Sequence, residues 1–283
     1  MTSNLSKTFR YVNDNGDELI LDYSHGFLIN KPNGIDTVQV SLSQAQGINQ
    51  TGATIQSRNV QPRPVTVSGR LVGDFQTENK TRLMSTVRPD ITGRLYADDY
   101  YLPVSVTASP TVSAKPRFAD FQFSLLAPYP YWQRDNSVTT TLSGVAPRFK
   151  FPWNVSRPYR FGEIVRNQFI NINNAGQVPV PFSVTFAAAD AVVNPKLTDA
   201  GSGKFLLLNK SLVAGERLVV EITHDRTNVV SSVDGECRGA LALTSNLFRL
   251  AVGDNVLKPE AESGKDSLEV SIDYAIEIVG VVL

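Results

Sequence analysis

The stretch Phe121–Trp132, FQFSLLAPYPYW, decides how the chain is organised. Phe121, Phe123 and Leu125 fall on one face of an extended chain, which predicts a half-buried β-strand. Two prolines and three aromatic residues follow, and proline both stiffens a connection and keeps the preceding residue out of helical geometry. The stretch therefore predicts a strand that closes one domain, with a boundary near residue 135.

Short alternating or β-branched runs recur on both sides of this boundary, separated by Gly, Pro, Asn and Asp. Before residue 135 the predicted strands are Glu18–Tyr23, Thr37–Ser43, Pro64–Val72, Tyr101–Thr107 and Phe118–Leu126. After it they are Gln168–Ile172, Val180–Ala187, Lys204–Leu208, Arg217–Thr223, Asn228–Ser232, Phe248–Ala251 and Ser267–Val282. A length of 283 residues suits two domains. We predict an all-β fold of two antiparallel β-sandwich-like domains, residues 1–135 and 136–283.

One segment of the first domain has helical spacing instead. In Thr77–Arg88, TENKTRLMSTVR, Leu83, Met84 and Val87 fall on one side of a helix and Pro89 follows. Thr77 is the expected N-cap. A helix of about three turns is marginal alone in water, so we expect it to dock on the domain.

Charge and composition exclude several classes of protein. The chain has 27 Lys+Arg and 27 Asp+Glu, 42% hydrophobic residues and one cysteine. Neither half is basic, which argues against a specific nucleic-acid binder, and the hydrophobic share argues against a disordered chain. No apolar run approaches the ~20 residues needed to span a bilayer, and the N-terminus lacks a signal-peptide pattern. We expect no membrane insertion, and synthesis and folding in a cytosol.

Candidate chemical groups do not form a catalytic or metal-binding pattern. His25 and His224 are about 200 residues apart, and lone Cys237 is expected to pack as a small hydrophobe. Gly201–Lys204, GSGK, lacks the rest of a phosphate-binding loop. No catalytic residue, cofactor site or metal site is therefore predicted, and the chain is not expected to be an enzyme.

Aromatic residues near the boundary leave a binding function open. Tyr129, Tyr131, Trp132 and Trp153 crowd this region. They are expected to pack at the junction between the domains, but exposed aromatic faces on a β-sandwich also bind sugars. A carbohydrate-binding, lectin-like module acting in adhesion to a host surface is therefore the alternative, and it would place Trp132 or Trp153 on an exposed face.

Four stretches, in this order, resemble the distal tail protein family of long, non-contractile-tailed bacteriophages. They are the Pro-Tyr-aromatic motif of Phe121–Trp132, the turn Asn173–Gly176 followed by VPVPFSVTF, FLLLNKSLVAGERLVVEI (Phe205–Ile222) and LFRLAVGDN (Leu247–Asn255). Where the family usually has Asp before its Pro-Tyr, this chain has Ala127 or Tyr129. The resemblance implies a ring-forming N-terminal domain and a galectin-like jelly-roll C-terminal domain.

The resemblance also implies partners and a place in the virion. Six copies are expected to form a homohexameric ring at the tail tip, assembled in the host bacterial cytoplasm. One face is expected to bind the tail tube protein and the other the tail hub protein and tip fibre, with receptor-binding proteins or cell-wall carbohydrate further out.

A closed ring needs two different contact patches on each subunit. The helix and the hairpin that turns at Asp98 and Asp99 are the expected contacts. The candidate contact residues are Leu83, Met84, Arg88, Asp98, Asp99 and Tyr100. A tail-tip component of a contractile or bacteriocin-like particle shares this ring logic, and a glycosidase is a more distant alternative.

Overall fold

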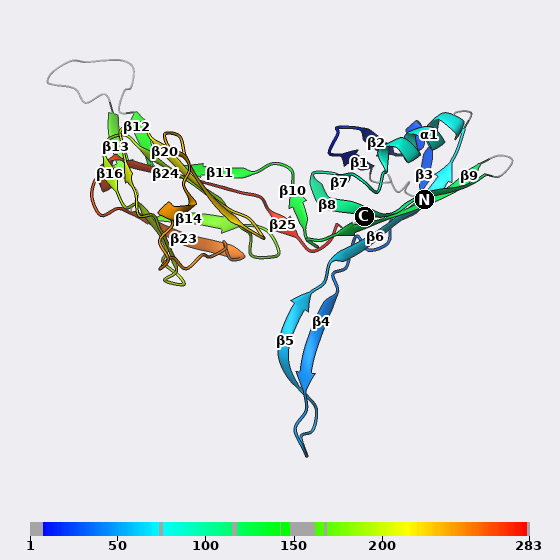
Figure 1. Ribbon diagram of the computed structural model, residues 1–283, viewed down its shortest axis with the longest axis horizontal. Coiled ribbons are helices and arrows are strands. Elements are labelled where there is room, and N and C mark those ends of the chain that lie inside the picture. The colour runs from blue at the N-terminus through cyan, green and yellow to red at the C-terminus, as the bar shows by residue number, and fades with distance from the viewer. Residues whose placement is uncertain are drawn as a thin grey trace. The chain divides into compact units, whose positions relative to one another are not determined.

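The strand predicted at Phe118–Leu126 is β9 (Ala119–Ala127), whose alternate residues are buried. It lies inside the sheet of the first of two compact units, between β8 and β6. The computed structural model (Figure 1) describes residues 8–73, 76–114, 118–141, 143–147, 162–166 and 169–281. Unit 1 comprises Met1–Asp135 and Glu277–Leu283, and unit 2 comprises Asn136–Ile276. The segment from Glu277 onward, predicted in the second domain, thus belongs to the first.

Unit 1 is built on one nine-stranded antiparallel sheet with the order β2-β1-β7-β8-β9-β6-β3, to which β10 and β25 add beside β8. Its strands are β1 (Phe9–Asn13), β2 (Glu18–Leu21), β3 (Phe27–Ile29), β6 (Arg63–Leu71), β7 (Thr92–Ala97), β8 (Tyr100–Ala114), β9, β10 (Trp132–Arg134) and β25 (Glu277–Ile278). The inward residues of these strands form one core that includes Tyr11, Phe27, Phe121, Phe123 and Trp132. The predicted hairpin is confirmed, since β7 and β8 are joined by Asp98 and Asp99.

The predicted helix is α1 (Gln76–Thr86), which begins one residue before Thr77. Thr77 therefore lies in the first turn and is not the N-cap. The helix docks on the sheet through Leu83, which is buried in the core of unit 1 together with Val87, the residue that follows the helix. A short 3-10 turn, η1 (Tyr23–His25), lies nearby, and Asn79 Nδ2 donates a hydrogen bond to the His25 carbonyl oxygen over 3.0 Å.

A buried arginine holds the returning segment in unit 1. Arg63 is 2% exposed and donates hydrogen bonds to the carbonyl oxygens of Ile35, over 2.7 Å, and of Val279. Trp132, which is fully buried, donates its indole N–H to the same Ile35 oxygen over 3.1 Å. Burial lowers the pKa of Arg63 to about 10, against the opposing effect of Asp36. The guanidinium is still charged at neutral pH, and a buried charge needs these carbonyl partners.

Unit 2 is a β-sandwich. One sheet has the order β11-β24-β15-β20-β21-β22 and the other β14-β23-β17-β18, with the short pairs β12-β13 and β16-β19 beside them. The bounds of the first sheet are β11 (Val138–Thr141), β15 (Ser183–Ala188), β20 (Arg217–Ile222), β21 (Thr227–Ser231), β22 (Gly235–Glu236) and β24 (Leu268–Tyr274). The remaining bounds are β12 (Ser143–Pro147), β13 (Gly162–Arg166), β14 (Ile170–Asn174), β16 (Val192–Val193), β17 (Lys196–Asp199), β18 (Phe205–Leu207), β19 (Ser211–Leu212) and β23 (Gly253–Glu260). Short 3-10 turns are η2 (Arg238–Ala240) and η3 (Lys265–Ser267).

Both sheets of unit 2 contribute to one core. Val184 and Phe186 of β15 belong to it together with Leu197 of β17 and Leu257 of β23. An all-β fold with one α-helix among the described residues confirms the predicted fold class. One predicted strand is wrong, because Phe248–Ala251 makes only an isolated bridge, between Leu250 and Val180.

Candidate assembly surface

A two-stranded hairpin of unit 1 lies outside the main sheet. It consists of β4 (Val40–Ala45) and β5 (Thr54–Val60), which pair with each other and with no other described strand. Every residue of both strands is exposed. Figure 1 shows the hairpin in blue, extending away from the sheet that contains β6. We call this element the β4–β5 hairpin.

The two faces of the β4–β5 hairpin differ in chemistry. Val40 pairs with Val60, Leu42 with Arg58 and Gln44 with Ile55, so these side chains share one face. The register shifts between Ser43 and Gln44, and this bulge brings Ile55 onto the face of Leu42. The paired residues of the opposite face have small or polar side chains. These are Ser41, Ser43, Ala45, Thr54, Ser57 and Asn59.

The apolar face of the β4–β5 hairpin has no cover within the described part of the chain. Val40, Leu42, Ile55 and Val60 are 50%, 44%, 45% and 39% exposed, respectively. An isolated two-stranded hairpin is marginally stable in water, and gathered exposed aliphatic side chains mark an interaction surface. Binding of a partner to this face would cover the aliphatic side chains and stabilise the hairpin.

The candidate contact residues of the helix differ in accessibility. Met84 is 43% exposed, and Arg88 is exposed and pairs with Asp90. Leu83 is fully buried because its position on α1 faces the sheet. Leu83 therefore supports the helix and cannot be a subunit contact, which corrects that part of the prediction.

The turn between β7 and β8 is accessible. Asp98 has a positive φ of 53°, a backbone conformation that Asp tolerates better than bulkier residues. Asp99 is exposed and lies 3.9 Å from Arg134. Tyr100 is partly buried against the core of unit 1. The turn thus presents two acidic side chains, while the tyrosine contributes mainly to the core.

The boundary aromatics within the described residues belong to unit 1. Trp132 is fully buried, so it cannot stack on a sugar. Tyr129 and Tyr131 pack edge to face with their ring centroids 5.4 Å apart, and the Tyr129 hydroxyl donates to Glu277. Trp153 lies outside the described residues. The lectin-like alternative therefore receives no support from Trp132.

The described residues contain no group of three or more His, Cys, Asp or Glu side chains that could hold a metal ion. His25 Nδ1 lies 2.6 Å from Asp22 in the η1 turn, and Cys237 packs against the core of unit 2. None of the helices among the described residues has the length and apolarity to cross a bilayer.

The β4–β5 hairpin is the feature that sequence reasoning missed. The sequence predicts a strand at Thr37–Ser43 but does not predict its partner strand. The available signal was the alternation of Val40 and Leu42 with serines, followed by β-branched Thr54 and Ile55. The bulge interrupts the matching alternation in β5, and it therefore hides the shared face.

Comparison with known proteins supports this architecture. Residues 175–276 match the family model SPP1_Dit, described as "Siphovirus-type tail component, C-terminal domain". The crystal structure of the Dit protein (gp 19.1) of phage SPP1, titled a paradigm of hub adsorption apparatus in Gram-positive infecting phages, is similar with a TM-score of 0.70 and 14% sequence identity. That similarity covers 96% of this chain and 99% of the SPP1 chain. A chain of the phage P2 baseplate in its activated conformation with Ca is similar with a TM-score of 0.51, 8% identity, and coverage of 98% of this chain and 100% of that one. No curated protein matches.

These findings define a class first: residues 175–276 match the C-terminal domain of siphovirus-type tail components, and the chain shares its fold with a phage tail protein. Within that class, the resemblance to distal tail proteins is confirmed by the family match and by a fold shared with SPP1 Dit over nearly the whole chain.

Proposed function

We propose that the chain forms a homohexameric ring at the distal end of a long, non-contractile phage tail. The ring joins the tail tube protein to the tail hub and its tip fibre, and it anchors receptor-binding proteins. The chain folds in the host cytoplasm and functions in the virion. The observation that carries the proposal is the β4–β5 hairpin of unit 1, whose four aliphatic side chains face solvent in the single chain.

The hairpin suits a ring contact because it can bind one neighbouring subunit while a different patch of the same subunit binds the other. In a closed ring each subunit offers one patch to the next subunit and a different patch to the previous one. An arm outside the main sheet can lie on a neighbour without requiring the same arm in return. The fold shared with SPP1 Dit, whose structure is titled a paradigm of hub adsorption apparatus, supports a place at the tail hub.

The hairpin alone is too small for a stable interface. Strands of six and seven residues are about 20 Å long. A face of about 20 by 10 Å is roughly a quarter of the ~800 Å² that each partner buries in a typical interface. The body of unit 1 must contribute the rest, and Met84, Arg88, Asp98 and Asp99 are accessible for this purpose.

The neutral charge of the chain also fits this function. With 27 Lys+Arg and 27 Asp+Glu, the chain can surround a channel through which DNA passes without strong phosphate binding. The function requires binding surfaces only.

The native mass of the purified full-length chain tests the proposal. Light scattering is expected to give about six times the 31.0 kDa of one chain, and negative-stain images are expected to show rings. A monomer at every concentration, without rings in the images, would contradict the proposed ring.

A further inference from the structure

A cleft in unit 2 gathers positive charge at residues that the proposed ring does not use. It has a volume of about 710 Å³ and is lined by Lys204, Arg226, Arg238 and Arg249 together with His224. Beyond residue 135 the chain has 14 Lys+Arg against 15 Asp+Glu. The cationic side chains of this cleft are therefore a local concentration in a neutral part of the protein.

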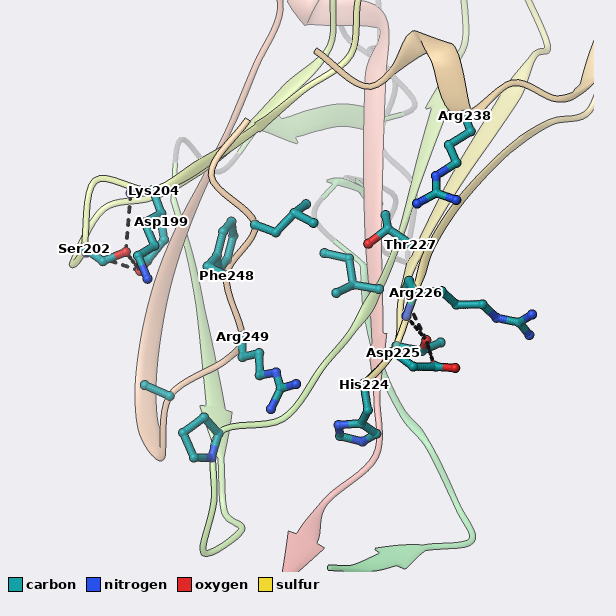
Figure 2. Close-up of a pocket in the computed structure, with 15 residues that line it drawn as sticks. Asp199, Ser202, Lys204, His224, Asp225, Arg226, Thr227, Arg238, Phe248 and Arg249 are labelled. Carbon is teal, nitrogen blue, oxygen red and sulfur yellow. Dashed lines mark hydrogen bonds between the residues drawn. The ribbon is translucent and has the colours of Figure 1, made fainter. Parts of the chain in front are cut away.

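The cations come from separate segments of the fold. Lys204 ends the turn between β17 and β18, Arg238 begins η2, and Arg249 precedes β23. Figure 2 shows the guanidinium groups of Arg238 and Arg249 extending into the space between these segments, while that of Arg226 extends away from it. Three segments thus place Lys204, Arg238 and Arg249 around one cleft.

The two carboxylates that line the cleft accept hydrogen bonds from residues of the turns in which they lie. Asp199 accepts hydrogen bonds from the backbone N–H of Gly201, over 3.1 Å, and from the N–H and hydroxyl of Ser202. Asp225 accepts a hydrogen bond of 2.8 Å from the Thr223 hydroxyl, and this bond holds the pKa of Asp225 below its ordinary value.

Three of the cations, by contrast, have no carboxylate partner among the described residues. Within the described part of the chain, Lys204, Arg238 and Arg249 form no side-chain ion pair or hydrogen bond. The cleft therefore has unused capacity for an anion.

The shape and lining of the cleft indicate the kind of anion. Pockets of about 300–1,000 Å³ hold small ligands, whereas a protein partner needs a broad face of roughly 800 Å². Guanidinium groups bind phosphate oxygens in pairs, and a lysine adds a point charge. Pro179 and Leu247, the latter 43% exposed, supply apolar contact of the kind that a sugar ring uses.

We infer that this cleft binds a phosphate-bearing saccharide through Arg238, Arg249 and Lys204. The inference goes beyond the proposed ring, since it concerns unit 2 and a different partner. It also places the saccharide at a cationic cleft, in contrast to the stacking on Trp132 that a lectin-like module would use.

Calorimetric titration of the full-length protein tests the inference, with glucose 1-phosphate as probe at low ionic strength. The protein is expected to bind glucose 1-phosphate more tightly than inorganic phosphate, and not to bind glucose. The double variant R238Q/R249Q is expected to weaken binding about a hundredfold, since loss of one hydrogen bond to a charged group costs about tenfold. Added salt is expected to weaken the binding of glucose 1-phosphate by the wild-type protein.

The control variant R217Q/K265Q removes the same charge from exposed positions of unit 2 that do not line the cleft. It is expected to bind like the wild-type protein, and an equal loss in the control would overturn the inference. No binding of glucose 1-phosphate, equal affinity for inorganic phosphate, or preferential binding of oligoglutamate would also overturn it. Light scattering on the same variants separates this result from the ring, because R238Q/R249Q is expected to keep the native mass of the wild type.

Discussion

Replacing Leu42 and Ile55 by threonine tests whether the apolar face of the β4–β5 hairpin holds subunits together. Threonine is β-branched and favours strands, so the hairpin itself is expected to persist. Leu42 and Ile55 are 44% and 45% exposed. Because full burial of such a side chain contributes about 1.5–3 kcal/mol, each has roughly 1 kcal/mol left to gain in a contact.

The threonine hydroxyls add the cost of burying two polar groups, so the L42T/I55T variant loses about 3 kcal/mol at each subunit contact. This corresponds to roughly a hundredfold weaker contact. Light scattering across a dilution series is expected to show wild-type rings at concentrations where the variant is dissociated.

The matched control is S41T/S57T, which introduces the same two residues on the opposite face of the hairpin. It is expected to assemble like the wild type. Thermal unfolding of the isolated subunits should show that both variants fold. Rings of L42T/I55T that persist at the same dilution as wild-type rings would refute the assignment of this face to the subunit contact.

Three further predictions concern the stability of the two units. Glu216 is 2% exposed; burial alone would raise its pKa, but hydrogen bonds from Ser231, from the backbone and from Lys210 outweigh burial and lower it. The stabilisation that the Glu216 carboxylate gives to unit 2 is present above its pKa of 4.5 in the unfolded chain. It is lost as pH falls through the lower pKa that this group has in the folded protein. E216Q is therefore expected to destabilise unit 2 by about 2 kcal/mol at pH 7 and to show a smaller loss of melting temperature in acid than the wild type. An unchanged acid response would contradict this. Gly34 has a φ of +87°, and a Cβ there would lie 2.1 Å from the Pro64 carbonyl oxygen, whereas a Cβ at Gly16, with φ +89°, would meet nothing within 4 Å. Denaturant unfolding is expected to show a loss of about 1 kcal/mol for G16A and several times that for G34A, and equal losses would count against the close approach. W132F removes the hydrogen bond to Ile35 and is expected to lower the free energy of unfolding by about 2 kcal/mol in the same measurement. An unchanged free energy of unfolding would contradict this.

The strands that sequence reasoning located best are those with one buried face. The predictions Pro64–Val72 and Phe118–Leu126 correspond to β6 and β9 within a residue or so at each end. In both strands buried residues alternate with more exposed ones, so the period of two in the sequence reports the period of two in the structure.

The predictions from sequence fail in two situations. In one, a side chain forms hydrogen bonds with the backbone a few residues away; in the other, segments far apart in the sequence pair with each other. Phe248–Ala251 looks like a strand, but the Asn255 side chain accepts a hydrogen bond from the Ala251 N–H and donates one to the Ala251 carbonyl oxygen. These bonds turn the chain back on itself. Composition and periodicity do not encode such a local competition with the sheet.

The candidate site was predictable in part. The turn at Asp98 and Asp99 follows from local residue preferences, and it is present. Which side of α1 faces the core is a tertiary property, so the sequence did not separate buried Leu83 from exposed Met84. The cationic cleft assembles residues 45 positions apart, from Lys204 to Arg249, and no pattern of spacing announces it.

The return of Glu277 to unit 1 links the stability of the proposed ring domain to the rest of the chain. β25 pairs with β10, and Arg63 donates to the Val279 carbonyl oxygen, so unit 1 uses a segment that follows all of unit 2 in sequence. Closing so long a loop costs entropy, which the buried contacts of Arg63 and Val281 must offset. Because β10 pairs with β8, and β8 begins at the turn between Asp98 and Asp99, the returning strand lies one strand away from the candidate contact residues. A chain that lacks this segment therefore leaves β10 unpaired on one side, and an unpaired strand edge is a template for pairing with the wrong partner.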